Sequence, residues 1–326
     1  MRRRELILLG AAAAVWPGTL HAQQKAMPVI GMLGTGSPGG WAPFGPAFHE
    51  GLRETGFVQG QNVAIERRWA QGHYDQLPAL AAELVSRKVD VIVSTGGPPT
   101  TLALKDATST IPIVFRLGGD VAKSGYVASF ARPGGNLTGV SLLADELTVK
   151  RLELLSELVP QARVIALLVN PNLATTERNI ASAEDFARAR GLQLAIVKAT
   201  TAGEIEDAFA SLLPLHAGGL VVSADPFLSN QREQIAALAL RHAVPGIYAW
   251  REFAAAGGLI SYGSSLTAAF RLMGVYAGKI LKGANPADMP VQQPTTFELV
   301  INLKTARTLG PEITQQLLAE ADEVIE

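Results

Sequence analysis

The stretch Val89-Asp90-Val91-Ile92-Val93-Ser94-Thr95-Gly96-Gly97-Pro98-Pro99-Thr100-Thr101 decides the fold of this chain. Residues 89–94 are rich in β-branched apolar residues, which indicates a buried strand. The loop that follows is rich in glycine and hydroxyl groups. Its two prolines suit the first turn of a helix, which we expect to continue to residue 106. A strand that leads directly into a helix is the repeating unit of parallel α/β sheets.

The same unit recurs on both sides of this stretch. Flanking it, we expect strands at 29–33, 62–69, 111–115 and 136–141 and helices at 44–55 and 77–87. The alternation then restarts, with helices at 150–158, 175–190, 204–212 and 231–242 and strands at 164–169, 192–197, 219–223, 244–248 and 259–262. This pattern predicts an α/β protein with two Rossmann-like lobes, each built on a parallel central sheet flanked by helices.

The end of the chain predicts how the lobes are connected. A helix is expected at 266–281 and a strand at 297–303, after the second lobe is already complete. A chain that crosses between the lobes more than once would use these elements to finish both. We therefore assign residues 28–142 plus about 265–290 to the N-terminal lobe. Residues 143–264 plus about 291–326 form the C-terminal lobe, and the short joining segment 141–148 predicts a close hinge.

The first twenty-two residues have the layout of a secretory signal peptide. Three arginines at 2–4 precede an uncharged, mostly apolar run at 6–16, and Ala22 closes the segment. The run has eleven residues, whereas a membrane-spanning helix needs about 20. The arginines at 3 and 4 also resemble a twin-arginine export signal. Cleavage near Ala22 would release the protein into the periplasm; because Leu20 stands where a small residue is preferred, an uncleaved anchor is the alternative.

Composition excludes several classes of function. The formal charge of the 326 residues is −1; the leader holds three Arg and one Glu, so the remainder carries −3 and shows no basic patch for nucleic acid. The chain has no cysteine, which excludes disulfides and thiolate chemistry. Its five histidines lack metal-ligand spacing, and there is no G-x-S-x-G motif. We therefore expect no enzyme activity, no cofactor and no metal.

The loop Gly34-Thr35-Gly36-Ser37-Pro38-Gly39 matches the dinucleotide-binding pattern G-x-G-x-x-G directly after a strand. Prolines at 43 and 46 delay the helix that these glycines should open, and no acidic residue follows at the expected distance. A polar loop after a strand is the simpler interpretation. We count Thr35 and Ser37 among the candidate ligand-binding residues.

The loop at 94–101 is the second candidate site. Its glycines allow backbone N–H groups to approach a ligand, and the start of the following helix favours an anion. Thr95, Gly96, Gly97 and Thr100 are the candidate residues. The loop has no lysine, so a carboxylate suits it better than a nucleotide triphosphate. Ordinary capping of the helix explains the same residues equally well.

The ends of other strands supply the remaining candidates. Asp225 ends a strand of the second lobe and could pair with an ammonium group, or cap the following helix. Asn170 ends the first strand of that lobe, where an Asx turn is the alternative. Tyr248, with Trp250 nearby, could cover an aromatic ligand or belong to ordinary packing. Asp120 has a comparable place in the first lobe.

Segments spread over nearly the whole chain carry a family resemblance. They lie at 29–31 with the following 37–38, and at 77–85, 89–93, 111–115, 132–139, 150–155, 225–227, 251–253, 257–263 and 297–304. Together they make the chain resemble the ABC-transporter substrate-binding family often labelled tryptophan/tyrosine transport substrate-binding proteins, which are type I periplasmic binding proteins. These segments are specific to the family and not to its ligand.

The resemblance implies a two-lobed receptor whose hinged cleft closes on a small solute. Such a receptor delivers the solute to a membrane permease and its ATPase, and we expect a monomer. The residues suggest an amino-acid-like ligand, with its carboxylate at the 95–101 loop, its ammonium at Asp225 and its side chain at Tyr248 or Trp250. An exported oxidoreductase that uses the loop at 34–39 and a sensory module that presents its ligand to a membrane receptor are the alternatives.

Overall fold

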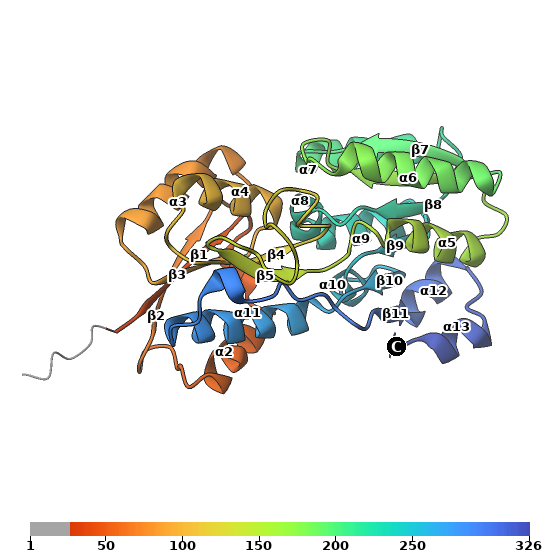
Figure 1. The fold of residues 1–326 in the computed structure, drawn as a ribbon. Helices are drawn as coiled ribbons and strands as arrows, with labels where there is room; N and C mark the ends of the chain where they lie inside the picture. The colour runs from red at the N-terminus through yellow and green to blue at the C-terminus, as the bar shows by residue number, and fades with distance from the viewer. Residues whose placement is uncertain (1–26) are drawn as a thin grey trace, which may run out of the picture.

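The computed structural model describes residues 27–326, and the predicted signal peptide lies outside the described residues. The described chain folds into two α/β lobes that lie side by side (Figure 1). Each lobe has its own sheet, flanked by helices, so the predicted α/β class with two Rossmann-like lobes is confirmed. No helix within residues 27–326 is both long enough and apolar enough to cross a bilayer.

The first lobe holds a parallel five-stranded sheet in the order β2-β1-β3-β4-β5. Its strands are β1 (Val29–Gly34), β2 (Ala64–Trp69), β3 (Val91–Ser94), β4 (Ile113–Leu117) and β5 (Leu137–Ser141). Its helical segments are α1 (Pro38–Trp41), α2 (Gly45–Glu54), η1 (Tyr74–Gln76), α3 (Leu77–Ser86), α4 (Pro98–Ala107), α11 (Leu266–Leu281) and η2 (Pro286–Asp288). Strands β1 and β3 are almost wholly buried, as their apolar sequences predict.

Helix α11 comes late in the sequence and packs along α2 of the first lobe (Figure 1). The two backbones meet at glycines. A methyl group on Gly274 would overlap the carbonyl oxygen of Phe48, and one on Gly51 would overlap the carbonyl oxygen of Arg271. Only glycine permits this approach, which holds the late helix firmly in the first lobe.

The second lobe holds a seven-stranded sheet in the order β12-β11-β10-β9-β8-β6-β7. Its strands are β6 (Val164–Val169), β7 (Gln193–Lys198), β8 (Ala217–Val222), β9 (Gly246–Tyr248), β10 (Ile260–Gly263), β11 (Glu298–Asn302) and β12 (Glu323–Ile325). Its helices are α5 (Thr148–Leu158), α6 (Thr176–Ala189), α7 (Ala202–Leu212), α8 (Pro226–Asn230), α9 (Arg232–Arg241), α10 (Arg251–Ala255), α12 (Leu303–Leu309) and α13 (Gln315–Glu320).

One strand pair departs from the expected parallel arrangement. Strand β11 runs antiparallel to β10, whereas the other pairs of this sheet are parallel. The cause is the path of the chain. It leaves β10 for α11 in the first lobe and returns to β11 at the same end of the sheet, so β11 must run back along β10.

Three connections between the lobes lie close together. They follow β5, β10 and η2. The first and third pair with each other, because Gln292 N–H donates to the Gly139 carbonyl and Ser141 N–H donates to the Gln292 carbonyl, both at 2.9 Å. The second joins them through Ser264, whose hydroxyl donates to the Leu142 carbonyl at 2.6 Å. The junction between the lobes is therefore a short hydrogen-bonded bundle of three chain segments.

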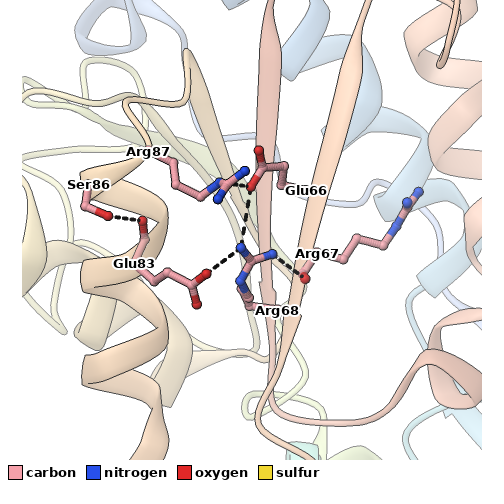
Figure 2. Close-up of polar contacts among 6 residues, drawn as sticks. All are labelled: Glu66, Arg67, Arg68, Glu83, Ser86 and Arg87. Carbon is pink, nitrogen blue, oxygen red and sulfur yellow. Dashed lines mark hydrogen bonds and ion pairs between the residues drawn. The ribbon is translucent and has the colours of Figure 1, made fainter.

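Strand β2 forms one edge of the first sheet and is rich in charged residues (Figure 2). Arg68 contacts Glu66 at 3.5 Å and Glu83 of α3 at 2.6 Å, and Arg87 pairs with the same Glu66. Arg67 extends to the other side of the strand. These charges attach α3 to the edge strand, and charged edge strands resist pairing with other chains.

Candidate functional site

A cavity lies between the two lobes at the ends of the parallel strands. The first-lobe wall follows β1, β3 and β4, and the second-lobe wall follows β8 and β9, which is where ligands bind in open α/β sheets. Its volume is about 90 Å³. On the same measure, one water molecule needs about 10–15 Å³. The lining includes Thr35, Ser37, Trp41, Phe44, Trp69, Thr95, Gly97, Arg116, Asp225, Trp250, Glu252 and Phe270.

The lobes touch around this cavity. A methyl group on Gly97, in the first lobe, would lie 2.8 Å from Cγ of Pro226 in the second. A methyl group on Gly36 would lie 2.8 Å from the Asn230 side-chain oxygen across the same gap. Strand-end loops of opposite lobes are thus in contact, and the structure has a closed cleft.

Hydrogen bonds among hydroxyl groups hold the 94–101 loop in its conformation. The Ser94 hydroxyl lies 2.7 Å from that of Thr100 and 2.8 Å from that of Thr101, and the Thr100 hydroxyl accepts from Gly96 N–H at 3.2 Å. Of the four predicted residues here, Thr95 and Gly97 line the cavity. Thr100 is fully buried, and with Gly96 it shapes the loop behind the lining.

Asp225 lies at the second-lobe wall and caps α8, which is one of the two roles predicted for its position. One carboxylate oxygen caps α8 by accepting from Leu228 N–H at 2.9 Å, and the other accepts from the Asn170 amide at 3.2 Å. Burial raises the pKa of this carboxyl to about 6. None of the described residues 27–326 supplies a cation in ion-pair contact with it. A buried acid without a counter-cation suits a cationic ligand group.

Three predicted residues lie behind the lining or away from it. Asn170 orients Asp225 and also accepts from Asn172 N–H at 3.0 Å, in the expected Asx turn. Asp120 accepts from the backbone N–H of Ala122 and Lys123, both at 3.0 Å. The hydrogen bond from Lys123 is the main cause of its lowered pKa. Asp120 therefore closes a turn.

Tyr248 is fully buried and stacks on Phe253 with ring centroids 4.6 Å apart. Strand residues alternate between faces, and the ring of Tyr248 points into the core of the second lobe. Trp250, two residues further on, lines the cavity and donates from its indole N–H to the Ser229 hydroxyl at 3.1 Å. In this structure the aromatic surface at the end of β9 is therefore that of Trp250.

Sequence reasoning missed the aromatic wall of the first lobe. Trp41 packs edge-on against Phe270 at 5.1 Å, Phe44 lies 4.8 Å from the same ring, and Trp69 lies 6.1 Å from Trp41. These residues come from α1, α11 and neighbouring segments that only the fold brings together. A wall of this kind favours a flat aromatic group.

It also missed two charged residues in the cavity. Arg116 lies in β4 and donates from Nη2 to the Thr95 carbonyl at 3.1 Å, with its guanidinium 5.2 Å from the Phe270 ring centroid. Burial lowers its pKa to about 10. Glu252 lies in the first turn of α10, and burial raises its pKa. An arginine inside an otherwise apolar strand was the available signal for Arg116.

A second cavity adjoins the first and shares Pro98, Gly118 and Ala224 with it. Within residues 27–326, no group of three or more His, Asp or Glu side chains is arranged to hold a metal ion. The first cavity thus combines buried charges of both signs, loop hydroxyls and an aromatic wall. This combination can bind a small charged molecule that carries an aromatic group.

Comparison with known proteins agrees with this architecture. Residues 45–325 match a family model described as "ABC transporter substrate binding protein". A curated "Tyrosine-binding protein" from Clostridioides difficile (strain R20291) is 28% identical over 269 residues, which cover 80% of this chain and 75% of that protein.

Two solved structures share the fold at 24% identity, each covering 91% of this chain and 99% of the other. One is an ABC domain from Streptococcus pneumoniae in complex with L-Trp, with a TM-score of 0.81. The other is the ligand-free, open structure of a substrate-binding protein with adhesive properties from Clostridium difficile, with a TM-score of 0.63.

Proposed function

The chain belongs to the ABC transporter substrate-binding protein family, and from this we propose that it is the solute-binding component of an ABC importer for an aromatic amino acid. Its fold is that of the type I periplasmic binding proteins. The observation that carries the proposal is the pairing of Asp225, a buried acid without a counter-cation, with an aromatic wall in one closed cavity.

The bound ligand has its ammonium group at Asp225 in this proposal. Its carboxylate lies at the loop around Thr95 and Gly97, where the start of α4 favours negative charge. Its ring lies against the first-lobe aromatics and Trp250. The same molecule then touches both lobes, so it binds the closed state better than the open one and drives hinge closure.

The comparisons support a closed, ligand-competent shape. The chain resembles the L-Trp complex more closely than the ligand-free open structure, although identity and coverage are equal. The relative from Clostridioides difficile is named for tyrosine binding, which fits the same ligand class. The membrane partners are a permease and its ATPase, and the predicted leader would place the protein in the periplasm.

A ligand screen on refolded, ligand-stripped protein tests the proposal. L-tyrosine, L-tryptophan and L-phenylalanine are compared with L-leucine and L-glutamate by thermal shift, and the hits are measured by calorimetric titration. A true ligand at 100 times its dissociation constant should stabilise the protein by about 2.7 kcal/mol. The proposal fails if no aromatic amino acid stabilises the wild type.

The ammonium role of Asp225 is tested with Asp225→Asn, which keeps an N-cap side chain for α8. Loss of a buried charged partner should weaken binding about 30-fold or more, in line with 2–5 kcal/mol for such pairs. Asp120→Asn is the matched control, because Asp120 lies outside the cavity, where it closes a turn and pairs with Lys123. Equal affinity of Asp225→Asn and wild type would remove Asp225 from the ligand site.

A further inference from the structure

The second cavity continues the first one between the lobes. Its volume is about 300 Å³, against about 90 Å³ for the first. Both cavities share a wall made of Pro98, Gly118 and Ala224. In the chain, Pro98 directly follows Gly97, the proposed carboxylate site, and Ala224 directly precedes Asp225, the proposed ammonium site. The second cavity therefore begins where the polar end of a bound amino acid lies.

The second cavity contains an acid and a guanidinium that do not pair with each other. Asp145 Oδ2 and Arg178 Nη2 lie 2.6 Å and 3.6 Å from the position that a methyl group on Gly119 would take. The two groups are thus neighbours, yet neither forms an ion pair within 4.0 Å in the described part of the chain. Burial raises the pKa of the Asp145 carboxyl, because the charges around it do not offset its loss of hydration.

The start of α6 adds two features that favour a carboxylate. Arg178 lies in the first turn of this helix, where the helix dipole attracts negative charge. The buried Oγ1 of Thr175, at the N-cap, has no hydrogen-bond partner within residues 27–326. Lys123 also lines the cavity but already pairs with Asp120 at 3.4 Å. Arg178 is therefore the lining cation that a ligand can engage.

The matching ligand group must accept from a guanidinium and donate to a nearby carboxylate. An α-carboxylate and the N–H on the same α-carbon do both. An amino acid extended through its ammonium would lose the charge that pairs with Asp225. An amino acid extended through its carboxylate keeps both the ammonium and the ring, and its new residue supplies a peptide N–H and a terminal carboxylate. The arrangement of the two cavities thus suits extension at the carboxyl end.

We propose that this protein binds dipeptides whose amino-terminal residue is aromatic, and binds them more tightly than the free aromatic amino acid. This inference rests on the proposed function, because it extends the ligand from the first cavity into the second. The terminal carboxylate accepts from Arg178 and the Thr175 hydroxyl, and the peptide N–H donates to Asp145. The side chain of the second residue lies against the apolar lining, which is formed by Leu117, Val121, Leu173 and Ala174.

Calorimetric titration of the ligand-stripped protein with matched ligands tests the inference. L-tyrosine, L-phenylalanine and L-tryptophan are each compared with the dipeptide that adds L-alanine at the carboxyl end, and with the amide of that dipeptide. At least one dipeptide should bind about tenfold or more tightly than its free amino acid, because it adds hydrogen bonds to charged groups. The amide lacks the terminal carboxylate and should lose most of this gain. If no dipeptide binds more tightly than its amino acid, the inference is overturned and the proposed function stands.

Arg178→Gln provides the second arm. It should weaken the dipeptide about tenfold and leave the free amino acid unchanged. Arg188→Gln in the same helix is the control, because Arg188 pairs with Asp185 at 3.0 Å on the exposed surface. Equal weakening of dipeptide and amino acid by Arg178→Gln would mean that the guanidinium binds the carboxylate of the amino acid itself, and the inference is wrong.

The stoichiometry separates the remaining outcomes. One dipeptide per protein is expected. Two molecules of free amino acid per protein, without tighter binding of the dipeptide, would assign the second cavity to a separate amino acid and overturn the inference. If wild type binds none of these amino acids or dipeptides, the proposed function itself fails.

Discussion

At the scale of single residues, the buried Asp225 carboxyl opposes the stability of the ligand-free protein at neutral pH. Its pKa is raised from 3.8 to about 6, mainly by burial and in smaller part by the charge of the nearby Asp145. Tyr74 is the other titratable group that its charge affects. A raised pKa means that the folded state prefers the protonated acid. The contribution of Asp225 to the free energy of unfolding is therefore fully present below about pH 4. It is lost as pH rises through 6, and the total loss is roughly 3 kcal/mol.

Asp225→Asn should therefore stabilise the ligand-free protein at neutral pH. We expect its melting temperature at pH 7 to exceed that of wild type by several degrees. The two should converge below about pH 4, where Asp225 of wild type is protonated in both the folded and the unfolded state. Thermal unfolding of ligand-free protein across this range checks the prediction. If the variant melts at a lower temperature than wild type at pH 7, the Asp225 carboxylate does not destabilise the ligand-free protein.

Ligand affinity should have the opposite pH dependence. An ammonium ligand needs ionised Asp225, so the affinity of wild type should be level above pH 7 and fall by up to about tenfold per pH unit below 6. Asp225→Asn should bind weakly at every pH in this range. Titrations at pH 5, 6, 7 and 8 make the comparison, and a flat wild-type profile would count against an ammonium at this position.

At the scale of elements, the loop before α1 limits how closely the lobes approach. Gly36→Ala places a methyl group 2.8 Å from the Asn230 side-chain oxygen in the other lobe, whereas a methyl group on Gly39 meets only the Ser37 hydroxyl, at 3.8 Å. We expect Gly36→Ala to weaken ligand binding several-fold with little change in ligand-free melting temperature, because the clash exists only in the closed state. Calorimetric titration measures the affinity.

Gly39→Ala serves as the control from the same loop and should bind like wild type. Combining Gly36→Ala with Asn230→Ala should restore most of the lost affinity, since the methyl group then has room. If the double variant binds no better than Gly36→Ala, the effect arises within the loop and not from contact between the lobes.

The sequence predicts long elements better than short ones. Apolar runs and helical spacing are sufficient to locate the central strands and helices such as α11, whose limits agree with the structure. Helices α8 and α10 have five residues each, too few for a periodic pattern to emerge. Asp225 could be proposed because it directly follows a strand. Arg116 and the aromatic wall could not, because their meeting depends on side-chain directions and on contacts between distant segments.

At the scale of the whole molecule, Arg151 connects two of the three segments that join the lobes. It is fully buried in α5 and donates to the Ala144 carbonyl at 2.7 Å and to the Tyr262 carbonyl at 3.3 Å. Burial lowers its pKa to about 10, so it remains charged at neutral pH. Ala144 lies just after β5, and Tyr262 lies in β10 just before the chain returns to the first lobe. One side chain thus holds both segments at the base of the second lobe.

Arg151→Met fills similar space but leaves both carbonyls without their donor. We expect it to lower the free energy of unfolding by about 3 kcal/mol, the sum of two modest penalties for unsatisfied groups. Ligand affinity should fall as well, because loosened connections between the lobes populate open arrangements that must be closed again on binding.

Lys150→Met at the neighbouring residue is the control, since Lys150 is exposed and its pair with Glu153 contributes about 1 kcal/mol or less. Denaturant unfolding gives the stability, and small-angle scattering with and without L-tyrosine gives the degree of closure. If Arg151→Met has the same stability and the same compaction as wild type, then the backbone hydrogen bonds between the connecting segments hold the lobes in place without this side chain.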